Sequence, residues 1–239
     1  MSTPASPLTE VSPAERLMSV QGEIAGHCAR YGRNPADVNL LAVSKTKPIE
    51  AIDAVAAAGQ RHFGENYLQE AVAKVEARPG LTWHFIGAIQ SNKSRLIARH
   101  FDWVHTVASR KVADRLSAAR SKDQPALNVC VQVNISNDPA KAGVAADDAA
   151  MLLAHIADLP HLQLRGLMAL PAQSDSLDDQ RVPFAALRTL GEAARARGLM
   201  QRVELSMGMS GDLEAAIAEG ATWVRIGTAI FGARAPRTT

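Results

Sequence analysis

The chain has 239 residues, 47% of them hydrophobic, which fits one large globular domain with a sizeable core. Its 26 Lys and Arg residues against 24 Asp and Glu give a net charge of +2, so the chain lacks the broad basic surface that nucleic-acid binding needs. The two cysteines lie far apart and the seven histidines show no close metal-binding spacing, so we expect neither a disulfide framework nor a metal site.

The N-terminal segment, residues 1–11, is rich in Ser, Thr and Pro and lacks the features of a secretory signal, so we expect a flexible tail. A helix is predicted to begin at Ser12-Pro13-Ala14-Glu15, which combines an N-cap serine, a first-turn proline and a glutamate three positions after the cap. No run of about 18 apolar residues occurs, so we expect a cytoplasmic protein without a membrane partner.

From Asn39 onward, short apolar runs alternate with Ala-rich, helix-favouring stretches, which is typical of βα units around a parallel sheet. Eight strands are predicted, at residues 40–44, 61–64, 82–86, 103–106, 128–134, 163–167, 202–205 and 223–226. The intervening helices are predicted at residues 49–58, 66–77, 111–119, 145–157, 181–197 and 212–218.

The number of these units and the chain length favour an α/β fold, a single (β/α)₈ TIM-type barrel with an extra N-terminal helix, over residues 12–239. An open, doubly wound sheet is the alternative, because strand counts from one sequence are uncertain. In either fold the chemistry lies just beyond the carboxyl ends of the strands.

Lys45 ends the apolar run of the first predicted strand, at a place where its amine has aliphatic neighbours. Partial burial of a lysine disfavours its charged form, and only the neutral amine forms a Schiff base with an aldehyde. The alternative is a strand-end lysine that reaches solvent. The residue type and position therefore indicate Schiff-base chemistry only if a second feature supports it.

Two glycine-containing loops late in the chain provide that second feature. Residues 207–211 and the segment that begins at Gly227-Thr228 each lead into a predicted helix start, where backbone N–H groups attract an anion. TIM barrels often build a phosphate site from their last two strand-to-helix loops. The alternative is that the glycines only make tight turns; together, the two loops favour a phosphate site.

Five segments in chain order resemble the pyridoxal phosphate homeostasis protein family, and the resemblance runs from about Ser12 to Gly232. They are residues 41–46 (LAVSKT), 63–67 (FGENY), 83–87 (WHFIG), 206–210 (SMGMS) and 224–228 (VRIGT).

The resemblance implies a barrel like the N-terminal domain of alanine racemase, with pyridoxal 5′-phosphate (PLP) held as a reversible aldimine on Lys45. It implies that Ser210, the Met209 backbone, Gly227 and Thr228 hold the phosphate, that Arg225 faces the pyridine nitrogen, and that Asn66 lies near the ring. Ser206 completes the set of cofactor-binding residues that we take from the family.

The resemblance also implies a role in PLP homeostasis that affects the balance of amino and keto acids, without catalytic residues. The related racemases take a second base, typically a tyrosine, from a β domain after the barrel, and few residues follow Gly232 here. We therefore expect a monomeric PLP carrier that serves PLP-dependent recipient enzymes. The alternatives are a weak PLP-dependent amino-acid racemase and a Schiff-base aldolase acting on a sugar phosphate.

Overall fold

The eight predicted strands form a closed parallel barrel in the computed structural model, which describes residues 11–233. The expected flexible tail at residues 1–11 lies outside the described residues except for Val11. Strand β1 pairs with β2 on one side and with the last strand on the other, and β4 pairs with β5, so the sheet closes and the open-sheet alternative is excluded. The barrel strands are β1 (Asn39–Val43), β2 (His62–Glu65), β3 (Thr82–Phe85), β4 (Trp103–Val107), β5 (Leu127–Asn134), β7 (Leu162–Met168), β8 (Glu204–Ser206) and β9 (Trp223–Ile226). The short β6 (Val144–Ala145) pairs only with the end of β5.

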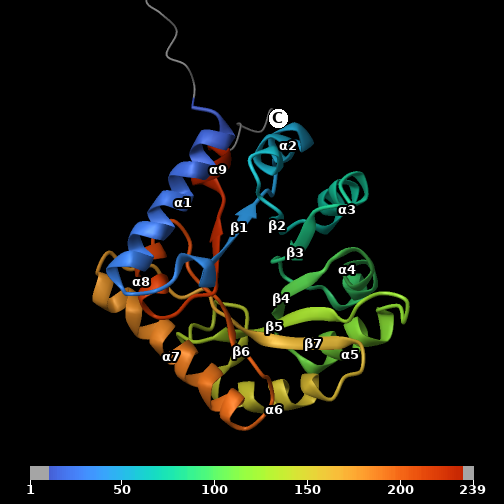
Figure 1. The fold of residues 1–239 in the computed structure, drawn as a ribbon. Helices are drawn as coiled ribbons and strands as arrows, with labels where there is room; N and C mark the ends of the chain where they lie inside the picture. The colour runs from blue at the N-terminus through green and yellow to red at the C-terminus, as the bar shows by residue number, and fades with distance from the viewer. Residues whose placement is uncertain (1–10, 234–239) are drawn as a thin grey trace, which may run out of the picture.

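The helices form a ring around the strands (Figure 1). The six predicted helices are confirmed, with ends within two residues of those expected except at the start of α7. They are α2 (Ile49–Ala57), α3 (Leu68–Ala77), α5 (Arg110–Ala119), α6 (Ala146–Ala157), α7 (Leu177–Ala196) and α8 (Leu213–Ala218); the others are α1 (Pro13–Arg30), α4 (Ser94–His100) and α9 (Thr228–Phe231).

Two differences from the predicted helices have local causes. Helix α7 begins four residues earlier than expected, because the Ser176 hydroxyl caps it by accepting from Asp179 N, and because the interior Pro183 hides the helical pattern. Helix α4 was not predicted: it is short and has no side-chain cap to mark its start.

The N-terminal helix α1 has the predicted capping box. The Ser12 hydroxyl accepts from Glu15 N at 3.3 Å, and the Glu15 carboxylate accepts from Ser12 N at 2.8 Å. The buried stripe of α1 covers the barrel beside α8 and α9, where the first and last strands meet (Figure 1). This stripe consists of Leu17, Val20, Ile24 and Cys28.

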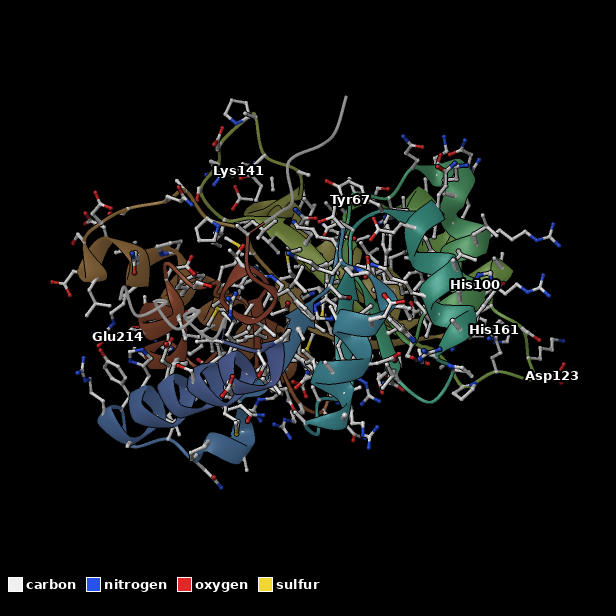
Figure 2. The ribbon with its side chains drawn as sticks, turned by 90° about the horizontal axis from the view of Figure 1, so that it is seen from above. Tyr67, His100, Asp123, Lys141, His161 and Glu214 are labelled. Carbon is white, nitrogen blue, oxygen red and sulfur yellow. The ribbon has the colours of Figure 1, made fainter. Side chains whose placement is uncertain are left out.

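Labelled residues locate loops at the two ends of the barrel strands (Figure 2). Tyr67 and Lys141, from the loops after β2 and β5, lie toward the upper edge of this view, whereas Asp123 and His161, from the segments before β5 and β7, lie lower. The loops of Tyr67 and Lys141 thus mark the carboxyl end of strands β2 and β5, the end where barrel proteins place their chemistry. Within residues 11–233, no helix has the length and apolar character to cross a membrane.

Replacing Gly166 tests how closely β7 packs against β8. A Cβ at this position would lie 1.8 Å from the carbonyl oxygen of Glu204, so Gly166→Ala must push the two strands apart. We expect a loss of about 3 kcal/mol in the free energy of unfolding, measured by urea denaturation. Gly22→Ala, in α1 with nothing near the added methyl, is the control and is expected to gain about 0.5–1 kcal/mol. Equal effects of the two substitutions would contradict this packing.

Candidate functional site

A cavity of about 500 Å³ opens at the carboxyl end of the barrel, between the first strand and the last ones. Lys45 comes from the end of β1, and Arg225 from β9. Six of the residues predicted to bind a cofactor meet here, although they come from opposite ends of the sequence. The cavity is lined by Lys45, Pro171, Ala172, Gln173, Ser174, Asp175, Gln180, Met209, Ser210, Gly211, Asp212, Arg225, Gly227 and Thr228.

The pairing of β1 with β9 brings Lys45 to this place. Leu41 lies opposite Arg225, and the register continues by one further pair toward the cavity. Beyond it, a Cβ at Gly227 would lie 3.2 Å from the Val43 carbonyl oxygen, so the two chains approach closely. Lys45 therefore follows β1 directly beside the loop of Gly227 and Thr228.

Arg225 provides a buried positive charge on the cavity wall, with only 5% of its surface exposed. Its guanidinium donates to the Ser206 hydroxyl at 3.0 Å and to the Ala169 carbonyl at 3.1 Å. Burial lowers the pKa of Arg225 to about 10, while the nearby Asp212 carboxylate acts in the opposite direction. Arg225 therefore stays protonated at neutral pH.

A chain of hydrogen bonds leads from Arg225 into the barrel interior. Ser206 Oγ lies 2.7 Å from His105 Nδ1, His105 Nε2 lies 2.9 Å from His84 Nδ1, and His84 Nε2 lies 3.0 Å from His62 Nδ1. An arginine only donates, so Ser206 Oγ accepts from it and has its own hydrogen to give to His105. If the hydroxyl gives this hydrogen to His105 Nδ1, the same direction continues along the hydrogen bonds and the proton of each histidine lies on Nε2.

The inner histidines of this chain are neutral. Burial, followed by the charge of Arg225, lowers the pKa of His105 to about 3, and burial lowers the pKa of His84 well below its usual value. The His84 ring stacks on Trp103, with centroids 5.4 Å apart and planes at 12°. The series of hydrogen bonds thus holds Arg225 through neutral groups. The positive charge of the Arg225 guanidinium therefore remains directed toward the cavity.

The loop after β8 makes a tight turn at its glycine. Gly208 has φ of +94°, and a Cβ there would lie 2.5 Å from the Ala216 Cβ, so only glycine fits. Met209 N donates to the Asp212 carboxylate at 2.6 Å. A phosphate would therefore find this N–H engaged, whereas Ser210 and Gly211 line the cavity beside it.

Two residues that the family resemblance places at the cofactor, Asn66 and Ser206, are not among those that line this cavity. Asn66 lines a neighbouring hollow together with Tyr67, Gly87 and Lys93, and its buried side-chain oxygen has no hydrogen-bond partner in the structure. Ser206 lies behind Arg225, as an acceptor for its guanidinium.

Sequence reasoning also missed part of the site. The cavity is closed on one side by residues 171–175, which follow β7, and by Asp212. In the sequence, only their position after a predicted strand could have indicated that these residues line the site, because the loop after β7 contains no recognisable motif. The partners of the three histidines depend on barrel closure and could not be read from their spacing.

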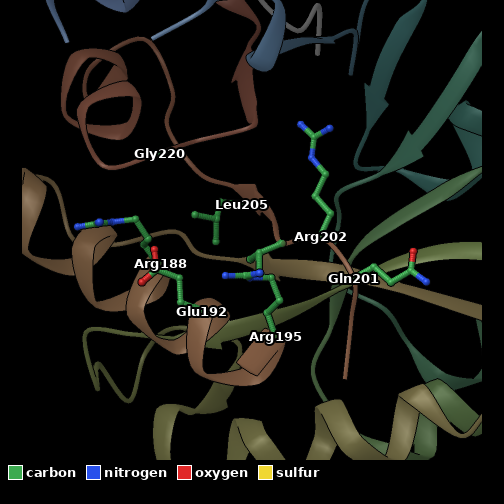
Figure 3. Close-up of a pocket in the computed structure, with 8 residues that line it drawn as sticks. Arg188, Glu192, Arg195, Gln201, Arg202, Leu205 and Gly220 are labelled. Atoms are coloured by element: carbon green, nitrogen blue, oxygen red, sulfur yellow. The ribbon is translucent and has the colours of Figure 1, made fainter. Parts of the chain in front are cut away.

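A third hollow, of about 390 Å³, lies at the amino-terminal end of β8 (Figure 3). Arg188 and Arg195 of α7 line it together with Arg202. Arg188 donates to Glu219 at 2.9 Å and Arg202 pairs with Glu204 at 3.4 Å, so two of these arginines already have acidic partners. The hollow also faces the barrel end opposite to the Lys45 cavity, which remains the stronger candidate.

The fold and the cavity define a class of protein: a barrel with a lysine at the end of its first strand and an arginine on its last. Residues 27–235 match the alanine racemase N-terminal domain family. Alanine racemase from Corynebacterium glutamicum shares this fold, with a TM-score of 0.69 at 18% identity over 95% of this chain and 62% of that one.

Relatives with higher sequence identity show which family within this class the chain belongs to. The chain is 53% identical to the pyridoxal phosphate homeostasis protein of Pseudomonas aeruginosa, over 92% of this chain and 95% of the relative, and 49% identical to that of Escherichia coli K12, over 92% and 96%. PipY of Synechococcus elongatus, solved with PLP bound, is 40% identical, with a TM-score of 0.81 over 92% of this chain and 100% of that one. The chain belongs to the pyridoxal phosphate homeostasis protein family.

The buried histidines predict how stability depends on pH. His105 has a pKa of 6.5 when unfolded and about 3 when folded, so below about pH 6.5 the unfolded chain binds more protons and stability falls. Each such histidine contributes a slope of about 1.4 kcal/mol per pH unit in this window. His105→Gln should reduce the slope of unfolding free energy against pH, measured by urea titration from about pH 6.5 down to about pH 4.

His161→Asn is the control, because His161 lies outside the chain of hydrogen bonds, before β7. We expect the wild-type slope for this variant. A slope of the His105 variant equal to that of wild type would contradict the neutral state of His105.

Proposed function

We propose that the protein binds PLP in the Lys45 cavity, takes it up and releases it reversibly, and does not turn over a substrate. The observation that carries this proposal is the convergence of Lys45, Arg225, Ser210 and Thr228 on one cavity of about 500 Å³. In this proposal the protein is a cytoplasmic monomer, and the PLP that it releases supplies PLP-dependent enzymes.

The residues present fit this cofactor. The cavity volume lies in the usual range for a small-molecule site. PLP has an aldehyde, a ring nitrogen and a phosphate, and the cavity offers an amine for the first, a guanidinium for the second, and hydroxyls with a glycine loop for the third. PipY, a relative that spans most of this chain, has been solved with PLP bound.

Lys45 makes the covalent contact in this proposal. Its neutral Nζ attacks the aldehyde carbon, a C=N bond forms, and the aldehyde oxygen leaves as water. The bond is reversible, because water returns the free amine and the aldehyde. The close pairing of β1 with β9 keeps this amine beside the loop of Gly227 and Thr228, where the phosphate is proposed to lie.

Arg225 disfavours turnover if it faces the ring nitrogen. PLP supplies an electron sink when its ring nitrogen is protonated, which an acidic neighbour stabilises. A guanidinium that stays protonated has no acceptor for that proton. Its hydrogen-bond partners, Ser206 and the Ala169 carbonyl, are both uncharged.

The ionisable side chains that line the cavity, among the described residues, are the candidates for a second base. They are Lys45, Asp175, Asp212 and Arg225. Two-base racemisation needs a second base on the face of the cofactor opposite the lysine. Asp212 already accepts the Met209 N–H at 2.6 Å, which occupies one of its oxygens.

Replacing Lys45 tests the covalent contact. Lys45→Ala should lose the absorbance band of protein-bound PLP, because no other amine is proposed to reach the aldehyde. Lys93→Ala, in the neighbouring hollow, is the matched control and should keep the band. Retention of the band by the Lys45 variant would refute the assignment.

Turnover separates a carrier from the weak racemase alternative. We expect no change in chirality and no product when the PLP-loaded protein is incubated with D- or L-amino acids, as followed by chiral chromatography. Sustained racemisation that disappears in Lys45→Ala would instead make the protein an enzyme.

The phosphate loops give a separate prediction. Ser210→Ala and Thr228→Val should each weaken PLP binding about tenfold, because each removes a hydroxyl from the proposed phosphate site. Pyridoxal, which lacks the phosphate, should bind each variant as it binds wild type. An equal loss of affinity for both ligands, measured by titration, would place the phosphate elsewhere.

A further inference from the structure

The turn after β1, residues 44–47, has an unusual backbone next to Lys45. Thr46 has φ of +62°, in the left-handed region, which is costly for a β-branched residue. Asn137 is the other non-glycine residue with positive φ within residues 11–233, and asparagine tolerates this region better. The Thr46 conformation therefore needs support from its surroundings.

A buried ion pair lies beneath this turn. Glu65, at the end of β2, has no exposed surface, and Lys74 of α3 is 7% exposed. Lys74 Nζ donates to the Glu65 carboxylate at 2.9 Å and to the Ser44 carbonyl at 2.9 Å. The Ser44 hydroxyl donates to the same Glu65 oxygen at 2.6 Å. The hydroxyl and the carbonyl of Ser44 are thus held by the pair.

Glu70 of α3 extends this cluster to Thr46. Its carboxylate accepts from Thr46 N at 2.7 Å and also from Lys74 Nζ. On the other side of the turn, Lys47 Nζ donates to the carbonyls of Phe231 and Gly232, at the end of α9, at 3.1 and 2.9 Å. The backbone on both sides of Lys45 is therefore fixed by side chains from β2 and α3.

Stability alone gives a poor account of the buried pair. Burying two charges is costly, and a well-packed apolar pair of similar size is often as stable or more so. The second carboxylate oxygen of Glu65 is buried without a hydrogen-bond partner in the structure, which adds to the cost. Burial accordingly raises the pKa of Glu65. What the pair does provide is a donor and acceptors for the polar atoms of the turn.

We propose that Lys74, Glu65 and Glu70 are positioning residues that hold Thr46 in its left-handed conformation and thereby place the Lys45 amine for bond formation with PLP. This inference rests on the proposed function of Lys45. It concerns the alignment of the amine alone, so binding of the phosphate and ring does not depend on it.

The double substitution Lys74→Met with Glu65→Gln tests the inference without leaving an unpaired buried charge. Met cannot donate to the Ser44 carbonyl or to Glu70, so the Glu70 carboxylate that accepts from Thr46 N loses its anchor, and Thr46 can leave the left-handed region. We expect about tenfold weaker PLP binding and a slower rise of the absorbance band. Pyridoxine 5′-phosphate, which has the ring and phosphate but no aldehyde, should keep its affinity within about twofold.

A third substitution, Thr46→Gly, should rescue the double variant. Glycine adopts positive φ without steric cost, so the turn no longer needs the cluster, and PLP affinity should return to within about twofold of wild type. Asn137→Gly, at the other left-handed residue, is the matched control and should not rescue.

Three results would overturn the inference. The first is that the double variant binds PLP as tightly as the wild-type protein does. The second is an equal loss of affinity for pyridoxine 5′-phosphate, which would indicate a collapsed cavity. The third is that Thr46→Gly fails to restore PLP affinity, which would indicate that the charges act without the backbone. Each differs from a failure of the proposed function, which would appear as bound PLP retained by Lys45→Ala in an otherwise wild-type chain.

Discussion

The pairing of the first strand with the last is the constraint on which the site depends. Because β1 lies in register with β9, Lys45 leaves its strand beside Gly227, about 180 residues further along the chain. Without closure, the amine and the glycine loops would lie on separate edges of an open sheet. Closure also creates the interior in which Arg225 is buried, so the same pairing sets both the position of the lysine and the electrostatics of its cavity.

The interior of the barrel is polar where many barrels are aliphatic. His105 and His84 are buried, neutral and hydrogen-bonded in series, and the series ends on Ser206 and Arg225. A carboxylate in the place of Ser206 would neutralise the guanidinium. The hydroxyl holds it in position and leaves its charge for the cavity. This arrangement supports the proposal that PLP is held on Lys45 without being strongly activated.

The sequence was sufficient to predict the barrel strands, because apolar runs mark parallel strands. It was also sufficient to predict six of the residues that line the cavity, because the residues that follow parallel strands meet at one end of a barrel. Its limits lie where side-chain partners depend on three-dimensional register. Asn66 follows β2 as expected, yet it lines the neighbouring hollow. The Met209 N–H is engaged by Asp212, and Lys74 looks like an ordinary helical lysine until α3 is packed against the Lys45 turn. Helix α4 lacks a capping signal and was missed for that local reason.

The most direct test of the account is to find which lysine bonds to PLP. The wild-type protein is incubated with PLP, reduced with borohydride to fix the C=N bond as a stable amine, digested and mapped by mass spectrometry. We predict that the modification lies on Lys45. Modification of Lys47, Lys74 or Lys93 instead, or the absence of any modified lysine, would contradict the assignment of this cavity as the cofactor site.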